Sequence, residues 1–385
     1  MFIRFKVIIL LVCLVIIILL QLFWLALIIL ISIVFCLFFN LVIFKFLIKN
    51  KWLQGIFKVI GLFILSILIR VFCIDIYTVS GESMENTLYS GDIVFINKLI
   101  YGPSVPASLY GIPWINIAWR IIHKDSIDYS TLYWDVYRLK GISQINRGDI
   151  IVLTTQPFNM HSILFIKRCI AISGDTIAIK NGVVNINGNL QSDPSLSKNP
   201  YYIKIKNIVK FNQKTDSLKI RTRKQIITKH ELYMDLTHQE KTSIKNNVDS
   251  LAIKIVDEDN WVYPKDSIFQ WTIDNYGSVI IPQKGMTIHL NNYTYRIYEK
   301  TIKESEQKII EQRNGSFYIK DSIITEYTFQ NDYYFFMGDN RHNSKDCREW
   351  GIFIPAKYII GKTNVVLFSN NKFNNGYKRL FKIVK

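Results

Sequence analysis

A serine and a lysine stand out among the residues of this chain that could do chemistry. Ser83 lies in a turn-forming segment, where Gly81 would let a substrate approach the backbone closely. Lys167 lies inside an apolar run, although lysine is almost never fully buried without a reason. Burial disfavours the ammonium form and can bring a lysine pKa from about 10.4 toward 7–8. A neutral amine of this kind can accept the proton of a serine hydroxyl, so the pair predicts nucleophilic catalysis.

Each segment also has a simpler interpretation. Ser83 alone fits an ordinary turn serine, because turns favour Ser and Gly. Lys167 alone fits a lysine at the end of a strand that points to solvent. The usual base for a serine is histidine, and the chain has six histidines but no Gly-x-Ser-x-Gly segment. The choice between these interpretations depends on whether the two residues meet.

A polar loop over residues 337–351 is the third candidate segment. It is rich in Gly, Asp, Asn and Ser, which form turns through side-chain-to-backbone hydrogen bonds. Ser344 in this loop could orient the lysine amine by hydrogen bonding. Asp346 and Arg348 could pair and hold the loop in place.

The five cysteines form no CxxC pair and no Cys/His cluster, so no metal site is expected. Cys169 and Cys347 are the candidates outside the apolar N-terminal part, and an oxidising compartment would permit a disulfide between them. The sequence leaves open whether they meet.

The elements that must position these residues are mainly strands. Turn residues followed by β-branched and aromatic runs predict strands at 93–96, 150–153 and 176–179. Asn181-Gly182 predicts a two-residue hairpin. The run 163–172, which carries Lys167, is apolar on both alternating faces, as in a strand buried on both sides.

Two stretches interrupt this pattern. Residues 102–146 are rich in Pro, Tyr and Trp and are predicted to form an irregular insertion. Residues 191–325 are polar and Lys-rich and are predicted to form an inserted α+β subdomain. Its predicted strands are 278–281 and 287–290, and its predicted helices are 229–246 and 303–311.

The N-terminal part is predicted to be a membrane anchor over residues 1–76. A spanning helix needs about 20 apolar residues, and a cleaved signal peptide has an apolar region of only about 7–15. The apolar run 7–44 fits two spans, and the run 56–74 fits one more. The three predicted spans are about 5–22, 25–44 and 56–74.

Lys and Arg placement predicts the orientation of this anchor. Arg4 and Lys6 precede the first span, and Lys45, Lys49, Lys51 and Lys58 lie between the second and the third. Both groups are cytoplasmic if the first run folds as a hairpin, so residues from about 77 onward lie outside the cytoplasm. The net charge of +17 favours contact with anionic lipid, or reflects a generally basic proteome. Nucleic-acid binding is not expected of a domain outside the membrane.

Three segments, in this order behind an anchor, resemble the boxes of type I signal peptidases, the Ser-Lys family that processes secretory precursors. That family's first box reads approximately G-x-S-M-x-P-T-L-x-x-G-D, and Gly81–Asp92 matches it except for Asn86 in place of Pro. The middle boxes resemble 147–150 and 167–175. The last resembles 338–348, with Cys347 where Ser is common.

The resemblance implies a role for each matching residue. Ser83 would be the nucleophile and Lys167 the general base. The supporting residues would be Ser344, which orients Lys167; Asp346 and Arg348, which brace the site; and Asp339, which pairs with Arg168.

Substrate binding and the oxyanion hole would involve the residues around the nucleophile. Some family members place a Ser two positions before it, where this chain has Gly81. The Ser83 amide would then be one hydrogen-bond donor to the oxyanion. The second donor would be another backbone N–H or the neighbouring Ser80. Met84 is expected to line the substrate site, and Asn86 changes the turn that follows Ser83.

The resemblance implies a mainly β catalytic core of coiled antiparallel sheets with an inserted α+β subdomain, behind an N-terminal α-helical transmembrane anchor. The core would comprise residues 77–190 and 326–385. The implied activity is a serine endopeptidase that cuts signal peptides from exported precursors after small residues, without a metal or organic cofactor.

The implied place is the cytoplasmic (inner) membrane, with several spans and with the catalytic domain on the extracytoplasmic side. Expected partners are precursor proteins that carry signal peptides, and membrane lipid; the secretion machinery is a further candidate. The alternatives are a soluble self-cleaving protease with the same core, a catalytically inactive envelope scaffold, and a non-enzymatic membrane receptor.

Overall fold

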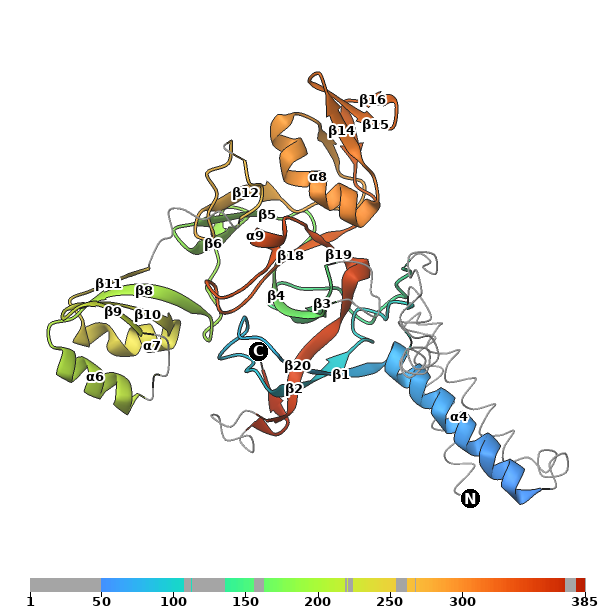
Figure 1. Ribbon diagram of the computed structural model, residues 1–385, viewed down its shortest axis with the longest axis horizontal. Coiled ribbons are helices and arrows are strands. Elements are labelled where there is room, and N and C mark those ends of the chain that lie inside the picture. The colour runs from blue at the N-terminus through green and yellow to red at the C-terminus, as the bar shows by residue number, and fades with distance from the viewer. Residues whose placement is uncertain are drawn as a thin grey trace, which may run out of the picture.

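The structure of the chain, a computed structural model, describes residues 50–106, 112, 136–155, 163–218, 220, 224–253, 262–266, 268–370 and 379–384. Figure 1 shows how its elements are arranged. The helices are α4 (Lys51–Phe72), α6 (Ile208–Ser217), α7 (His238–Ile244), α8 (Asn292–Glu306) and α9 (Cys347–Trp350), with 3₁₀ turns η3 (Lys245–Asn247) and η4 (Ala356–Tyr358). The strands are β1 (Ile74–Thr78), β2 (Asp92–Asn97), β3 (Ile150–Leu153), β4 (Phe165–Ala171), β5 (Thr176–Lys180), β6 (Val183–Ile186), β7 (Asn189–Leu190), β8 (Lys198–Lys204), β9 (Lys224–Thr228), β10 (Glu231–Thr237), β11 (Ser250–Ile253), β12 (Tyr276–Ile280), β13 (Thr287–His289), β14 (Ile310–Arg313), β15 (Ser316–Ile319), β16 (Ser322–Ile324), β17 (Glu326–Thr328), β18 (Tyr333–Met337), β19 (Ile354–Pro355), β20 (Ile359–Ser369) and β21 (Lys382–Ile383).

The helix α4 extends away from the rest of the molecule (Figure 1). It begins after Asn50, whose side chain accepts the N–H of Trp52 at 2.9 Å and so caps the first turn. Apolar side chains such as Leu62 and Phe63 are exposed along it. Its length and composition are sufficient to cross a membrane, and it overlaps the third predicted span. The first two predicted spans, 5–22 and 25–44, lie outside the described residues.

The main sheet has the order β1-β2-β20-β3-β4-β18-β19, with β21 also paired to β20, and neighbouring strands are antiparallel. The long strand β20 pairs with β2 along one part and with β3 along another, and its register shifts in both pairings. Such irregularities bend a strand and increase its twist. Gly361 permits this close approach, since a Cβ there would lie 2.7 Å from the carbonyl oxygen of Asn97. The sheet therefore curls, and the mainly β prediction is confirmed.

Both faces of this sheet are covered. Ile150 and Val152 of β3 belong to one apolar cluster, and Ile151 and Leu153 belong to another. The neighbouring β4 is also largely buried, although Phe165 and Ile170 are only partly so. The predicted burial of 163–172 on both faces therefore holds for the middle of the run but not for its start, since Ile163 is 66% exposed. A side chain in the middle of β4, from 166 to 169, is thus held away from water whichever face it lies on.

A second sheet, β12-β5-β6-β7, follows directly after β4. Its β5–β6 hairpin turns at Asn181 and Gly182, with φ of 49° and 76°, which is the left-handed geometry that a two-residue turn requires. The predicted hairpin is therefore confirmed. On its other side, β5 pairs antiparallel with β12, which lies about 100 residues later in the chain.

The predicted unit 191–325 is divided by its packing. Residues 198–253, here called the lobe, form the sheet β11-β8-β10-β9 with α6 and α7 (Figure 1). The lobe has an apolar cluster of its own, which includes Ile203, Phe211 and Leu236. Side chains of β12 and α8, by contrast, pack into the main core around Phe335.

Two helices predicted in this stretch differ from the structure. Residues 231–237 form the strand β10, and the helix α7 begins only at His238. Within β10, Leu232, Met234 and Leu236 are buried while the residues between them are less so, a period of two that favours a strand. The helix predicted at 303–311 begins earlier, as α8, and ends at Glu306; the strand β14 follows.

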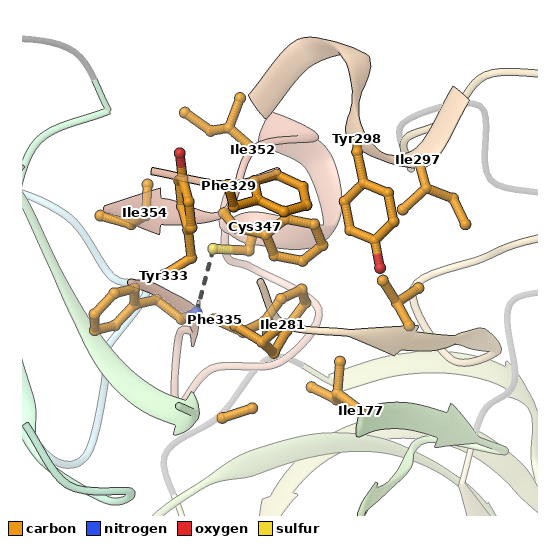
Figure 2. Packing of buried hydrophobic residues seen from close by; sticks show 14 of the residues in the cluster. Ile177, Ile281, Ile297, Tyr298, Phe329, Tyr333, Phe335, Cys347, Ile352 and Ile354 are labelled. Carbon is orange, nitrogen blue, oxygen red and sulfur yellow. Dashed lines mark hydrogen bonds between the residues drawn. The ribbon is translucent and has the colours of Figure 1, made fainter. Parts of the chain in front are cut away.

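Figure 2 shows the buried aromatic and aliphatic side chains of the main core, among which Cys347 at the start of α9 is packed. The rings of Tyr298 and Phe329 lie 5.5 Å apart, centroid to centroid. Cys347, the first residue of α9, accepts the N–H of Phe336 on its sulfur at 3.2 Å. Cys169 and Cys347 are both buried free thiols, so the disulfide that the sequence permits is not formed.

Candidate active site

The turn that carries Ser83 is pinned to the core by its neighbours. It leaves β1 and returns to β2, and the Val79 N–H donates to the carbonyl of Asp92 at 2.8 Å. Within it, the Leu88 N–H donates to the carbonyl of Met84 at 2.7 Å. Met84 and Leu88 are almost completely buried in one apolar cluster. Ser83 itself is only partly buried, so its hydroxyl is held on a fixed base at the surface of the core.

Lys167 reaches this hydroxyl from β4. Its side chain is only 3% exposed, and its Nζ lies 2.5 Å from the Oγ of Ser83. Burial lowers the pKa of Lys167 from 10.5 to about 8; the Asp346 carboxylate opposes this change and the Arg348 guanidinium adds to it. An appreciable fraction of the amine is therefore neutral near pH 8, in contact with a hydroxyl whose proton it can accept.

Two buried ion pairs support the site. Arg168, the residue after Lys167, donates to both carboxylate oxygens of Asp339 at 2.7 and 2.6 Å. Asp346 and Arg348 form a second two-bond pair at 2.9 and 2.8 Å. Bidentate pairs of this kind fix orientation as well as charge. Both pairings agree with those expected from the sequence.

Ser344 lies beside the site but does not make the predicted hydrogen bond. Its hydroxyl is buried and has no partner among the described residues. A Cβ at Gly338 would lie 2.3 Å from this hydroxyl and 2.5 Å from the carbonyl oxygen of Ser83. The loop thus passes so close to Ser83 that glycine is required at 338, while the amine of Lys167 is directed to Ser83.

The residues expected to bind substrate differ in exposure. Ser80 and Gly81 are exposed, whereas Met84 is 1% exposed and accepts the Asp339 N–H on its sulfur at 3.4 Å. Within the described part of the chain, no acceptor binds the N–H of Ser83. This amide is free to donate to an oxyanion.

Asn86 differs from the resembled box in geometry as well as in type. Its φ is 74°, in the left-handed region that Asn tolerates better than most residues. Proline has φ fixed near −65° and cannot adopt this conformation. The turn after Ser83 therefore has its own shape in this chain.

A cleft of about 320 Å³ opens beside the two residues. One wall is the stretch 77–84 and the other is the stretch 163–167, with Asn343 and Lys345 at the rim. The two walls are joined where the Tyr77 hydroxyl donates to the carbonyl of Leu164 at 3.1 Å. Extended walls with apolar side chains suit an extended peptide, which can pair with a strand-like edge.

Several contacts at the site were not predicted from the sequence. Thr87 donates its hydroxyl to Asp339 at 2.6 Å, and the Asn340 N–H donates to the carbonyl of Ser83 at 3.0 Å. Both residues lie inside the resembled boxes, which is a signal that could have drawn attention to them. Glu85 also lies inside a resembled box, but its partner Lys198, at 2.9 Å, lies outside all of them and carries no such signal.

Comparison with known proteins agrees with this geometry. The family model described as signal peptidase, peptidase S26, matches residues 49–243 and 278–368. The chain is 26% identical to a signal peptidase I of Aquifex aeolicus (strain VF5) over 309 residues, which is 80% of this chain and 81% of that protein. It is 26% identical to one of Buchnera aphidicola subsp. Acyrthosiphon pisum (strain APS) over 331 residues, 85% of this chain and 79% of that protein.

Another relative is matched over a shorter stretch. The chain is 26% identical to a signal peptidase I of Bacillus licheniformis over 151 residues, 39% of this chain, and the match spans 59% of that relative's length. The family match, in contrast, extends over most of this chain and includes Ser83, Lys167 and the loop with Asp339 and Asp346. A curled β-sheet that brings these segments together, and a match of this extent, lead to one conclusion: the chain belongs to the signal peptidase family, peptidase S26.

Proposed function

We propose that this protein is a membrane-anchored serine endopeptidase that removes signal peptides from exported precursors, with Ser83 as nucleophile and Lys167 as general base. The observation that carries the proposal is the buried Lys167 amine at 2.5 Å from the Ser83 hydroxyl. Family membership supports the same activity. The Ser-Lys arrangement is a known variant of the serine nucleophile activated by a base.

The reaction follows from the placement of these groups. The neutral Lys167 amine takes the Ser83 proton while Oγ attacks the scissile carbonyl carbon, and the carbonyl oxygen becomes an oxyanion. The free Ser83 amide donates to this oxyanion, with the exposed Ser80 and Gly81 as neighbouring candidates. The Lys167 ammonium then gives its proton to the departing amine, which leaves an acyl-enzyme. Lys167 next accepts a proton from water, whose oxygen attacks the ester, and Ser83 regains a proton as the acid product leaves.

The supporting residues act through Ser83 and Lys167. Arg168 with Asp339, and Asp346 with Arg348, hold β4, the Ser83 turn and the 338–348 loop in one geometry. Ser344, which lacks a partner among the described residues, is the candidate to orient the Lys167 amine when substrate enters. Walls with apolar side chains and a strand-like backbone edge favour an extended segment, and the small residues that precede the cut in exported precursors suit a cleft of about 320 Å³.

The proposed location is the outer face of the cytoplasmic membrane. The apolar helix α4 runs directly into β1, and β1 leads to the Ser83 turn, so a membrane-embedded α4 keeps the cleft near the bilayer. Lys and Arg placement favours a multi-pass anchor with the catalytic part outside. Membrane lipid and the secretion machinery are the proposed neighbours there.

The test is cleavage of a precursor by protein purified in detergent. Ser83→Ala and Lys167→Met are each expected to lower kcat by roughly 10³-fold or more, since a serine nucleophile and its base act as a unit. Ser322→Ala and Lys180→Met, which change exposed residues of the same types, serve as matched controls and should cleave normally. Cleavage at the wild-type rate by either dyad variant would refute the assignment and favour a scaffold role.

A further inference from the structure

The lobe is joined to the Ser83 turn by Lys198, the first residue of its strand β8. The Lys198 N–H donates to the carbonyl of Asp339 at 2.8 Å, and the Arg341 N–H donates to the carbonyl of Lys198 at 3.0 Å. These bonds form a short parallel bridge between Lys198 and Asn340. The Asn340 N–H in turn donates to the carbonyl of Ser83 at 3.0 Å. The segment 339–341 thus forms backbone hydrogen bonds both with Lys198 of the lobe and with Ser83, and so connects the two.

The side chain of Lys198 makes a second connection. It is only 3% exposed, and its Nζ lies 2.9 Å from the Oε2 of Glu85, two residues after Ser83. The same carboxylate oxygen accepts the side-chain N–H of Asn340 at 3.4 Å. The Glu85 N–H donates to the carbonyl of Glu82 at 3.0 Å, which closes the turn around Ser83.

A buried ammonium needs a partner, and Glu85, whose side chain is 31% exposed, supplies it to Lys198. The contact restrains the position of Glu85 because leaving the ammonium unpaired would be costly. The Ser83 turn has no regular secondary structure, so its position depends on contacts of this kind. Lys167 approaches Ser83 from the sheet, whereas Lys198 holds the turn from the lobe through Glu85. The ion pair of Lys198 with Glu85 thus opposes movement of the Ser83 hydroxyl away from the Lys167 amine.

We infer that Lys198 and Glu85 are positioning residues that hold the Ser83 turn in register with Lys167, and that the lobe acts in turnover through this ion pair. The inference rests on the proposed role of Ser83. It assigns the lobe a function in catalysis without contact to the scissile bond.

Steady-state cleavage of a precursor peptide by the full-length protein tests the inference. Lys198→Met is expected to lower kcat by about 10- to 100-fold with KM unchanged, because a misplacement of about 1 Å can cost that much in rate. Glu85→Gln keeps the side-chain volume and is expected to lower kcat in the same direction. The double variant should be no slower than Lys198→Met, since coupled residues are not additive.

The matched control is Lys204→Met, at the other end of β8. Lys204 also pairs with a carboxylate, Glu231 at 3.5 Å, but its side chain is 51% exposed and lies away from the site. Its kcat should stay within about twofold of the wild type, as for most exposed pairs. Equal effects of Lys198→Met and Lys204→Met, or strictly additive losses in the double variant, would overturn the inference.

Amide hydrogen exchange gives a readout that does not depend on activity. Peptides covering 80–90 should exchange faster in Lys198→Met and Glu85→Gln than in the wild type and Lys204→Met, while β4 keeps its protection. Unchanged exchange in the turn overturns the inference even if cleavage is lost. A wild-type protein that cleaves no precursor refutes the proposed function instead, and the exchange result still decides whether the pair holds the turn.

Discussion

The pKa of Lys167 predicts the pH dependence of cleavage. With a pKa of about 8 in the folded protein, the amine is protonated at pH 6 and mostly neutral at pH 9. At pH 6 only about one amine in a hundred is neutral, so kcat/KM should be roughly 100-fold below its plateau. Because the base must be neutral to act, the rate rises with pH through about 8.

Cleavage of a precursor peptide between pH 5.5 and 9.5 in detergent measures this profile. The control is His342→Gln. His342 lies in the 338–348 loop beside the site, where its Nε2 lies 2.8 Å from the Asp274 carboxylate. The midpoint should be the same in this variant and in the wild type. A flat profile between pH 6 and 9, or a midpoint that moves in His342→Gln, would refute the assignment of Lys167 as the base.

The same pKa makes a prediction about stability. Below pH 8 the folded protein holds the Lys167 ammonium in a buried position. The fall of its pKa from 10.5 to about 8 corresponds to a cost of about 3 kcal/mol in the free energy of folding. Between these two values the unfolded chain binds more protons, so stability rises with pH. Lys167→Met is thus expected to be more stable than the wild type by up to about 3 kcal/mol at pH 6–7, with the gain shrinking toward pH 10.5. Urea denaturation at pH 6.5 and 10 measures the difference; a destabilised variant at both would contradict the burial argument.

Three further predictions concern the surroundings of the dyad. Ser344→Ala should lower kcat about tenfold with little change in KM, as expected if its hydroxyl bonds the Lys167 amine only once substrate has entered; an unchanged kcat argues against its orienting role. Asp339→Asn should lower the free energy of unfolding by about 3–5 kcal/mol in chemical denaturation, because the buried Arg168 guanidinium loses its counter-charge; a change below about 1 kcal/mol would contradict this. Asn86→Pro should lower kcat/KM at least tenfold, whereas Asn86→Gly should not, since glycine, like asparagine, accepts the φ of 74° and proline cannot; equal rates would show that the turn has another shape.

Local patterns in the sequence predicted much of the core. The strands at 150–153 and 176–179 and the turn at Asn181-Gly182 follow from short-range preferences that the structure respects. Lys167 was identifiable because a charged residue inside an apolar run is unusual. The contact between Lys167 and Ser83 was expected from the resemblance, since residues 84 positions apart cannot be paired by local rules.

Other features depend on contacts that no local pattern encodes. Residues 231–237 have a strand period, but the helix-forming residues after them favoured one longer helix. The pairing of β12 with β5 places residues 276–280 in the core although the polar sequence around them indicated a separate unit. The buried pair of Arg379 with Asp92 joins residues 287 positions apart. Lys198 looked like one more lysine in a Lys-rich stretch until its burial was known.

The most direct test of the account is to find the atom that becomes acylated. A slowly hydrolysed peptide ester, quenched in acid during turnover and followed by peptide mass mapping, should leave its acyl group on the fragment that contains Ser83. The amount of adduct should fall sharply in Lys167→Met, because the hydroxyl then lacks its base. An acyl group on another residue, or an equal amount of adduct without Lys167, would contradict the claim that this amine activates Ser83.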